Sequence, residues 1–206
     1  MILVSAALPA ELDDQFKGID VLFTGIGKIN AAIELTRAIE KHKGDVELVI
    51  NFGTAGSSYW RKGTLLLCDR IFERDMVCHL PEFRDTNPQH LPTSLMPMPG
   101  NLEPVACFTS DTFMEKADLE KLPGDSIADM EAFALAKVCW KYGVRFTSVK
   151  MISDGEDLDA RGEEIWREHR ARGAKQFRTI YDFIVRGQHD HRNLGLGESL
   201  VRSGAV

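Results

Sequence analysis

The chain has 206 residues, 44% hydrophobic and 27% charged, a balance typical of an ordinary soluble globular domain. Its 25 Lys and Arg against 31 Asp and Glu give a formal charge of −6, which argues against binding to nucleic acid or to an anionic membrane. No apolar run reaches the roughly 18 to 20 residues of a membrane-spanning helix, and the N-terminus lacks the basic segment of an export signal. We therefore expect a cytoplasmic protein.

The first quarter of the chain has the pattern of a βαβ unit. Residues 2–7 and 19–23 are short apolar runs that predict buried strands, and a helical pattern then extends to Gly44. A third apolar run, 46–52, enters the small-residue loop 53–56. Strand, helix and strand in this order predict parallel pairing with a right-handed crossover. One face of the helix carries Ile29, Ala32, Ile33 and Thr36.

The rest of the chain continues the alternation of strands and helices. Residues 75–100 hold five of the eight prolines and show no period, which predicts a long loop. After residue 186 the chain is polar and glycine-rich, so we expect one domain over 1–186 and a flexible tail over 187–206. Strands are predicted at 64–68, 71–73, 104–109, 125–128 and 144–152, and helices at 130–142 and 160–186.

Three acidic residues follow predicted strands at widely separated positions: Glu11, Glu131 and Asp154. Ligands of open α/β sheets bind at the carboxyl ends of strands, so these residues are candidates for one shared cleft. Carboxyl groups in one cleft suit bond hydrolysis, since one can protonate a leaving group while another deprotonates water. The alternative is that each acid is an ordinary loop or helix-capping residue.

Two glycine-containing loops are candidate binding elements. Residues 25–28 could bind a phosphate at a helix N-terminus, but they lack the spacing of a P-loop and of a dinucleotide fingerprint. The loop that ends at Gly56 lets backbone approach a ligand closely, although a tight turn has the same composition. The histidines show no metal-ligand spacing, and the cysteines no C-x-x-C pair, so we expect no metal, no cofactor and reduced, mostly buried thiols.

Five ordered segments resemble the nucleoside phosphorylase and nucleosidase superfamily, most closely its 5'-methylthioadenosine/S-adenosylhomocysteine nucleosidase branch. They are Ala7-Leu8-Pro9-Ala10-Glu11, the run Thr24 to Ala32, the run Asn51 to Gly56, Ser110-Asp111-Thr112-Phe113, and Asp129-Met130-Glu131-Ala132 followed by Ile152-Ser153-Asp154. The resemblance implies a three-layer α/β/α sandwich around a mixed, partly barrel-like central sheet. It also implies a homodimer, a role in methionine salvage and a purine nucleoside as the small-molecule substrate.

The resemblance implies a role for each matching residue. Glu11 looks like the group that activates the attacking water, Glu131 like the acceptor for the ribose hydroxyls, and Asp154 like the donor of a proton to purine N7. The residues implied to contact the substrate are Met130 on the sugar, Phe113 on the base, and Thr54 and Ser153 as polar partners.

The resemblance also indicates hydrolysis rather than phosphorolysis. Phosphorylases of the superfamily carry Gly-Asp-Pro with a nearby arginine at the N-terminus and an arginine before the second glycine loop, where this chain has residues 7–11 and Asn51. A phosphorylase and an inactive nucleoside-binding protein remain the alternatives. The chain departs from the family at Thr54 to Ser57, at Asp129, where glutamate is usual, and throughout 75–100. The base and the 5' substituent therefore stay open, with futalosine-type nucleosides included.

Overall fold

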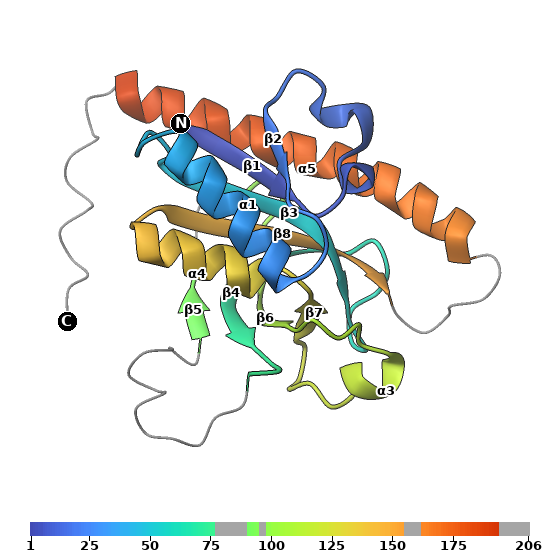
Figure 1. The fold of residues 1–206 in the computed structure, drawn as a ribbon. Helices are drawn as coiled ribbons and strands as arrows, with labels where there is room; N and C mark the ends of the chain where they lie inside the picture. The colour runs from blue at the N-terminus through green and yellow to red at the C-terminus, as the bar shows by residue number, and fades with distance from the viewer. Residues whose placement is uncertain (77–89, 95–97, 155–161, 194–206) are drawn as a thin grey trace.

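The computed structural model describes residues 1–76, 90–94, 98–154 and 162–193, which form one mixed sheet with helices on both sides. Figure 1 shows this arrangement. The strands are β1 (Ile2–Ala6), β2 (Val21–Phe23), β3 (Leu48–Gly56), β4 (Leu65–Glu73), β5 (His90–Pro92), β6 (Glu103–Thr109), β7 (Ile127–Asp129) and β8 (Arg145–Asp154). The helices are α1 (Lys28–Lys41), α3 (Lys116–Leu119), α4 (Ala132–Tyr142) and α5 (Gly162–Asn193), with 3-10 turns at Pro9–Glu11 and Asp13–Phe16.

Part of the sheet closes on itself. The strand order is β2-β1-β3-β7-β6-β4-β5, and β8 pairs with both β3 and β4, so that β3, β8, β4, β6 and β7 form a closed ring. Parallel pairs join β1 to β2 and β3, β3 to β8, and β6 to β4 and β7, whereas β3–β7, β4–β5 and β4–β8 are antiparallel. The predicted mixed, partly barrel-like sheet is confirmed. β2 and β3, which α1 connects, are parallel as predicted, but each pairs with β1, which lies between them, rather than with the other.

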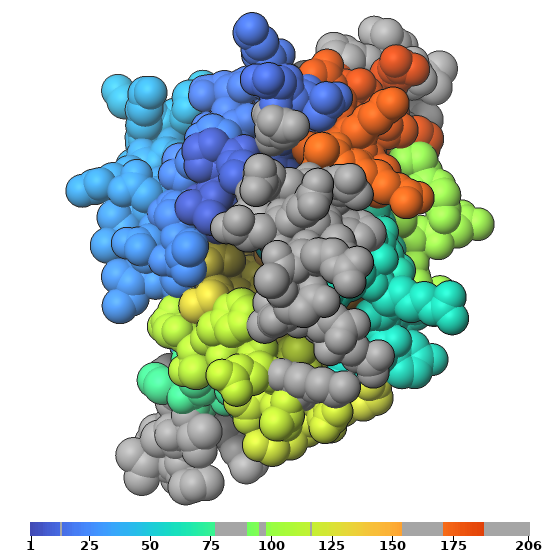
Figure 2. All heavy atoms as spheres, turned by 90° about the vertical axis from the view of Figure 1, so that its right-hand side faces the viewer, coloured from blue at the N-terminus to red at the C-terminus, as the bar shows by residue number. Residues whose placement is uncertain are grey.

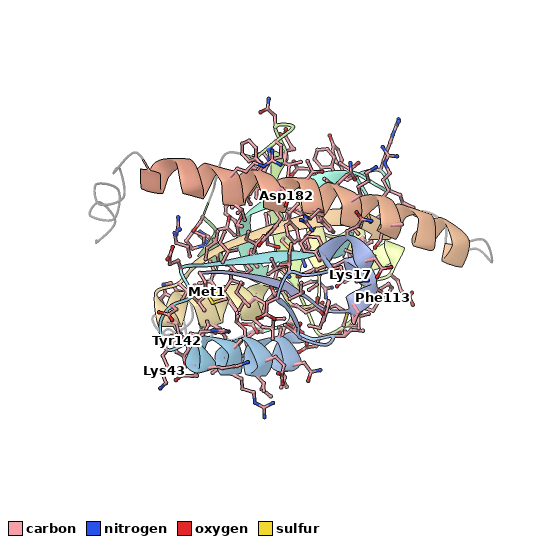
Figure 3. The ribbon with its side chains drawn as sticks, turned by 90° about the horizontal axis from the view of Figure 1, so that it is seen from above. Met1, Lys17, Lys43, Phe113, Tyr142 and Asp182 are labelled. Carbon is pink, nitrogen blue, oxygen red and sulfur yellow. The ribbon has the colours of Figure 1, made fainter. Side chains whose placement is uncertain are left out.

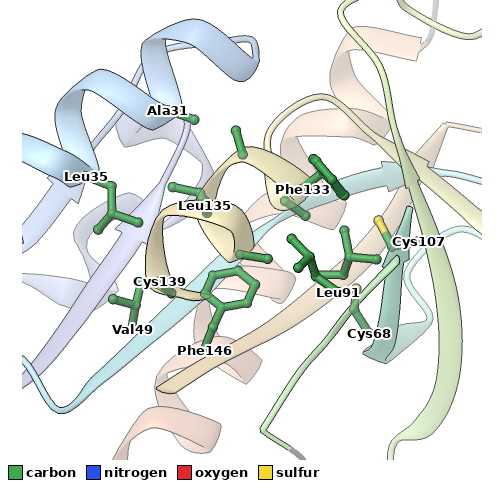
Figure 4. Close-up of a cluster of buried hydrophobic side chains, with 14 of the residues drawn as sticks. Ala31, Leu35, Val49, Cys68, Leu91, Cys107, Phe133, Leu135, Cys139 and Phe146 are labelled. Atoms are coloured by element: carbon green, nitrogen blue, oxygen red, sulfur yellow. The ribbon is translucent and has the colours of Figure 1, made fainter. Parts of the chain in front are cut away.

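Two hydrophobic clusters hold the three layers together, and Figure 3 shows the layers from above. On one face α1 and α4 pack on the sheet through Leu35, Leu135 and Phe146, in the cluster drawn in Figure 4. On the other face α5 packs through Phe177, whose ring stacks on Phe52 at 4.8 Å between centroids. Removing this apolar surface from water is the main favourable contribution to folding of such a domain.

Several element boundaries differ from the sequence prediction. β3 continues through Gly56, where a loop was expected, because the parallel strand β8 pairs with it up to that residue. The two strands predicted at 64–68 and 71–73 are one strand, β4, with a shift of register between Cys68 and Arg70. The predicted loop 75–100 contains β5, and its residues 77–89 and 95–97 lie outside the described residues. α5 continues to Asn193, past its predicted end, and 194–206 also lie outside them.

The buried face of α1 is not the face that carries Ile29, Ala32, Ile33 and Thr36. Its buried residues are Ala31, Leu35 and Ile39, whereas Ile29 is 71% exposed and Ile33 is 44% exposed. The three described cysteines, Cys68, Cys107 and Cys139, are buried free thiols. Within the described ranges, no helix combines the length and the apolar character needed to span a membrane.

Candidate active site

A cavity of about 240 Å³ lies where β1, β3, β7 and β8 end. Figure 2 views this end of the molecule, and Figure 3 places Phe113 there, at the opposite end from Lys43 and Tyr142. Parallel pairing brings the carboxyl ends of β1, β3 and β8 to one edge. The antiparallel strand β7 reaches the same place because its end pairs with the end of β3, Ala128 beside Gly56. The lining residues are Ala7, Leu8, Glu11, Ile26, Thr54, Ala55, Gly56, Thr112, Phe113, Met114, Leu119, Ala128, Asp129, Met130, Glu131 and Ser153.

Backbone and side-chain donors hold the buried carboxylate of Glu11 in place. Its Oε2 accepts hydrogen bonds from the N–H groups of Ala7 at 2.9 Å and Leu8 at 3.0 Å. Its Oε1 accepts from the Thr54 N–H at 2.9 Å and from the Thr54 hydroxyl at 3.2 Å. A Cβ at Gly53 would lie 3.1 Å from Oε1, so glycine leaves room for the carboxylate at this point. The side chain is thus fixed at the cavity wall.

Glu131 brings a second buried carboxyl group to the same cavity from the N-terminus of α4. Its Oε1 accepts a hydrogen bond from the Gly27 N–H at 2.8 Å, which links α4 to the start of α1. Burial, followed by the negative charge of Asp129, raises the pKa of Glu131 from 4.5 to about 7. Lys150 and the Gly27 N–H partly offset this rise. Glu131 therefore changes its protonation state near neutral pH.

We expect Glu131→Gln to stabilise the folded protein more at pH 8 than at pH 4.5. The folded state binds the Glu131 proton more tightly than the unfolded state, so this carboxyl group makes the wild type lose stability as pH rises from about 4.5 to 7. Glutamine mimics the protonated form and lacks that loss, and the gain reaches about 3 kcal/mol at pH 8. Urea unfolding at both pH values measures it, with the exposed Glu120→Gln as the control. If the gain in stability were the same at both pH values, the raised pKa of Glu131 would be contradicted.

A buried ion pair lies beneath the two carboxyl groups. Lys150 Nζ is 2.8 Å from Asp129 Oδ2, and both side chains are almost completely buried. Asp129 also accepts hydrogen bonds from the Thr109 hydroxyl at 2.6 Å and from the Ala132 N–H at 2.8 Å. Burial opposes ionisation of Asp129, but Lys150 and these donors hold its pKa below the ordinary value. The sequence analysis did not single out Lys150, although a lysine inside a central strand signals a buried partner.

All the other predicted residues except Asp154 line the cavity. Phe113 is 52% exposed at its rim, whereas Ser153 is buried and its hydroxyl has no hydrogen-bond partner among the described residues. Met130, Thr54 and Gly56 also line it. Asp154 ends β8, where its backbone pairs with that of Gly56, and its side chain lies outside the described residues.

The structure disfavours the phosphate site considered at residues 25–28. The Gly27 N–H donates to Glu131, and the Lys28 N–H donates to Asp111 Oδ1 at 2.8 Å, so carboxylates already occupy both donors. A phosphate there would face two negative side chains. The described residues also contain no group of three or more acidic, histidine or cysteine side chains arranged to hold a metal ion.

Comparison with known proteins identifies the family of this chain. The family model described as Phosphorylase superfamily matches residues 17–108 and 104–186. The 5'-methylthioadenosine/S-adenosylhomocysteine nucleosidase of Shewanella halifaxensis is 26% identical over 170 residues, covering 71% of this chain and 73% of that protein. Two solved structures share the fold at a TM-score of 0.70, each covering 90% of this chain and 97% of the other. They are the Helicobacter pylori 5'-methylthioadenosine/S-adenosylhomocysteine nucleosidase with butyl-thio-DADMe-Immucillin-A, at 18% identity, and the Helicobacter pylori futalosine hydrolase, at 17%. Because the family model matches most of its length, this chain belongs to the phosphorylase superfamily.

Proposed function

We propose that the protein hydrolyses the N-glycosidic bond of a purine nucleoside of the methylthioadenosine/S-adenosylhomocysteine type, releasing the free base and the ribose moiety. The observation that carries this proposal is the convergence of Glu11 and Glu131 on one cavity, beside Phe113 and Met130. An aromatic ring at the rim suits stacking on a purine. Buried carboxyl groups suit the hydroxyls and the developing positive charge of the ribose.

In the proposed reaction, water replaces the base at ribose C1'. The bond between C1' and purine N9 breaks and its electron pair leaves with the base, while Asp154 donates a proton to N7. Water forms the new bond to C1' and gives a proton to Glu11. Positive charge develops on the sugar before water bonds, and the Glu131 and Glu11 carboxylates stabilise that charge more than the uncharged ground state.

The lining of the cavity supports water over phosphate as the attacking group. Among the lining residues that the structure describes, none is Arg or Lys, and the nearby Lys150 is already paired with Asp129. A phosphate dianion would face Glu11 and Glu131 without the cationic partners that usually bind it. Asn51, which stands where phosphorylases of the superfamily have arginine, is buried and its Oδ1 accepts a hydrogen bond from the Ser148 hydroxyl.

The decisive experiment measures base release with and without phosphate. We expect the protein to release adenine from 5'-methylthioadenosine or S-adenosylhomocysteine in phosphate-free buffer, with adenosine, inosine and futalosine as comparison substrates. Release that depends strictly on phosphate would identify a phosphorylase instead. Thermal stabilisation by nucleoside without base release would identify a binding protein. The homodimer, the cytoplasmic location and the role in methionine salvage stay predictions.

A further inference from the structure

The side chain of Lys28 forms ion pairs with three carboxylates near the cavity. Lys28 Nζ lies 3.0 Å from Glu73 Oε1 and 3.8 Å from Asp111 Oδ2, and it also donates to Asp75 Oδ1. We call these four residues the Lys28 cluster. Glu73 ends β4, Asp75 follows it, Asp111 follows β6, and Lys28 begins α1. The cluster therefore joins the ends of two strands to the start of a helix.

Backbone hydrogen bonds extend the cluster to the cavity. The Lys28 N–H donates to Asp111 Oδ1 at 2.8 Å, and the Asp111 N–H donates to Asp75 Oδ2 at 2.9 Å. The preceding peptide N–H, that of Gly27, donates to Glu131 Oε1. Gly27 has a φ of 94°, in the region that favours glycine, and a Cβ there would lie 3.2 Å from Asp111 Oδ1. Neighbouring N–H groups of one turn thus hold Asp111 and Glu131.

The segments that the Lys28 cluster holds supply part of the cavity wall. Ile26 lies two residues before Lys28, and Thr112 and Phe113 directly follow Asp111. The Ser110 hydroxyl donates to the Thr112 carbonyl at 2.8 Å, which makes this turn compact. A shift of Asp111 would therefore move Phe113, and a shift of the α1 N-terminus would move the donor to Glu131.

We propose that Lys28 is a positioning residue for nucleoside binding, which holds the Phe113 turn and the Gly27 N–H in the geometry that the base and the ribose require. The inference rests on the proposed function. Lys28 itself does not line the cavity, so it acts through these neighbours.

Charge balance explains why this cation matters. The Lys28 ammonium group faces three carboxylates, of which Glu73 also interacts with Lys137. Removing the Lys28 charge leaves like charges close together that repel one another, above all those of Asp75 and Asp111. Because the Glu73, Asp75 and Asp111 side chains are partly exposed, dissolved salt screens their repulsion. If Lys28→Met raises KM because positioning is lost, that rise in KM becomes smaller as the salt concentration increases. A rise in KM caused only by lost packing would not depend on salt in this way.

The test compares Lys28→Met with Lys28→Arg and with Arg37→Met. Arg37 is on the same helix and forms an exposed ion pair with Glu34 at 2.9 Å, so it is the matched control. For adenine release from 5'-methylthioadenosine, we expect Lys28→Met to raise KM about 10 to 100-fold and to lower kcat by a smaller factor. Lys28→Arg should have a KM and a kcat close to those of the wild type, and about 0.5 M NaCl should bring the KM of Lys28→Met closer to the wild-type value. Unchanged KM in folded Lys28→Met would overturn the inference.

Amide hydrogen exchange separates this inference from the proposed function. Without nucleoside, the Gly27, Lys28 and Asp111 amides should exchange faster in Lys28→Met than in the wild type, and at unchanged rates in Arg37→Met. If the wild type releases no base, the proposed function fails, and the exchange rates still test the positioning. Unchanged exchange at all three amides in Lys28→Met would overturn the positioning role, whatever the activity of the wild type.

Discussion

Under the proposed function, we expect Glu11→Gln to lower the rate of adenine release by about 10² to 10⁴-fold, the usual contribution of a general base. The wild-type carboxylate accepts four hydrogen bonds, two on each oxygen. Glutamine keeps one oxygen acceptor but puts an NH₂ group opposite the donors of the other, and it cannot take a proton from water. Steady-state release from 5'-methylthioadenosine measures the loss.

The control for Glu11→Gln separates chemistry from folding. The substitution leaves one or two part-buried donors without an acceptor, since the Thr54 hydroxyl can itself accept from an NH₂ group, so the unfolding curve is measured beside the rate. Calorimetric binding of adenine reports whether the cavity persists. Glu120→Gln, at an exposed position, should leave the rate, the unfolding curve and adenine binding unchanged. A rate within about threefold of the wild type would remove Glu11 from the mechanism.

Lys150→Met should lower the free energy of unfolding by about 3 to 5 kcal/mol, the range measured when one partner of a buried ion pair is removed. Methionine fills much of the lysine volume, so the loss comes mainly from the Asp129 carboxylate, which is left buried without its cation. Burial then raises the pKa of Asp129 in the variant. The destabilisation should therefore be smaller at pH 5 than at pH 8, as urea unfolding can show.

Two further variants check the source of this loss. Lys121→Met removes a pair between exposed side chains, Lys121 and Asp118, and should leave stability nearly unchanged because water screens the pair. Adding Asp129→Asn to Lys150→Met removes the unpaired charge but keeps an oxygen for the Ala132 N–H. The double variant should therefore be more stable than Lys150→Met at pH 8. If the double variant were as unstable as Lys150→Met, the loss of unfolding free energy would come from packing rather than from the unpaired charge.

The place of Glu11 could be predicted, because it follows an apolar run and parallel pairing brings the ends of β1, β3 and β8 to one edge. Glu131 follows β7, which is antiparallel to β3, so its arrival at the same cavity depends on the pairing of Gly56 with Ala128, a contact that the sequence does not indicate. The resemblance added Phe113, Met130, Thr54 and Ser153, whose positions in loops and at strand ends no hydrophobic period could have specified. All of these lie at the cavity.

Closure of the sheet explains what could not be predicted. Residues 144–152 predict a strand, but the side that Lys150 faces depends on β8 pairing with both β3 and β4, a tertiary property. The small residues Gly53 to Gly56 favour a turn, yet β8 supplies hydrogen bonds that keep them extended. The polar residues Asp69 and Arg70 interrupt an apolar pattern, yet β4 continues through them with a shift of register against β6.

The closed ring also limits how the folded chain can associate with other chains. Within the described residues, the path of strands ends at β2, Val21–Phe23, and at β5, His90–Pro92, each only three residues long. Pro92 has no N–H to donate. Unpaired strand edges are templates for aggregation and amyloid growth, and short or proline-containing edges are common protections against it. The topology that gathers the carboxyl groups thus leaves little backbone on which a foreign strand can add.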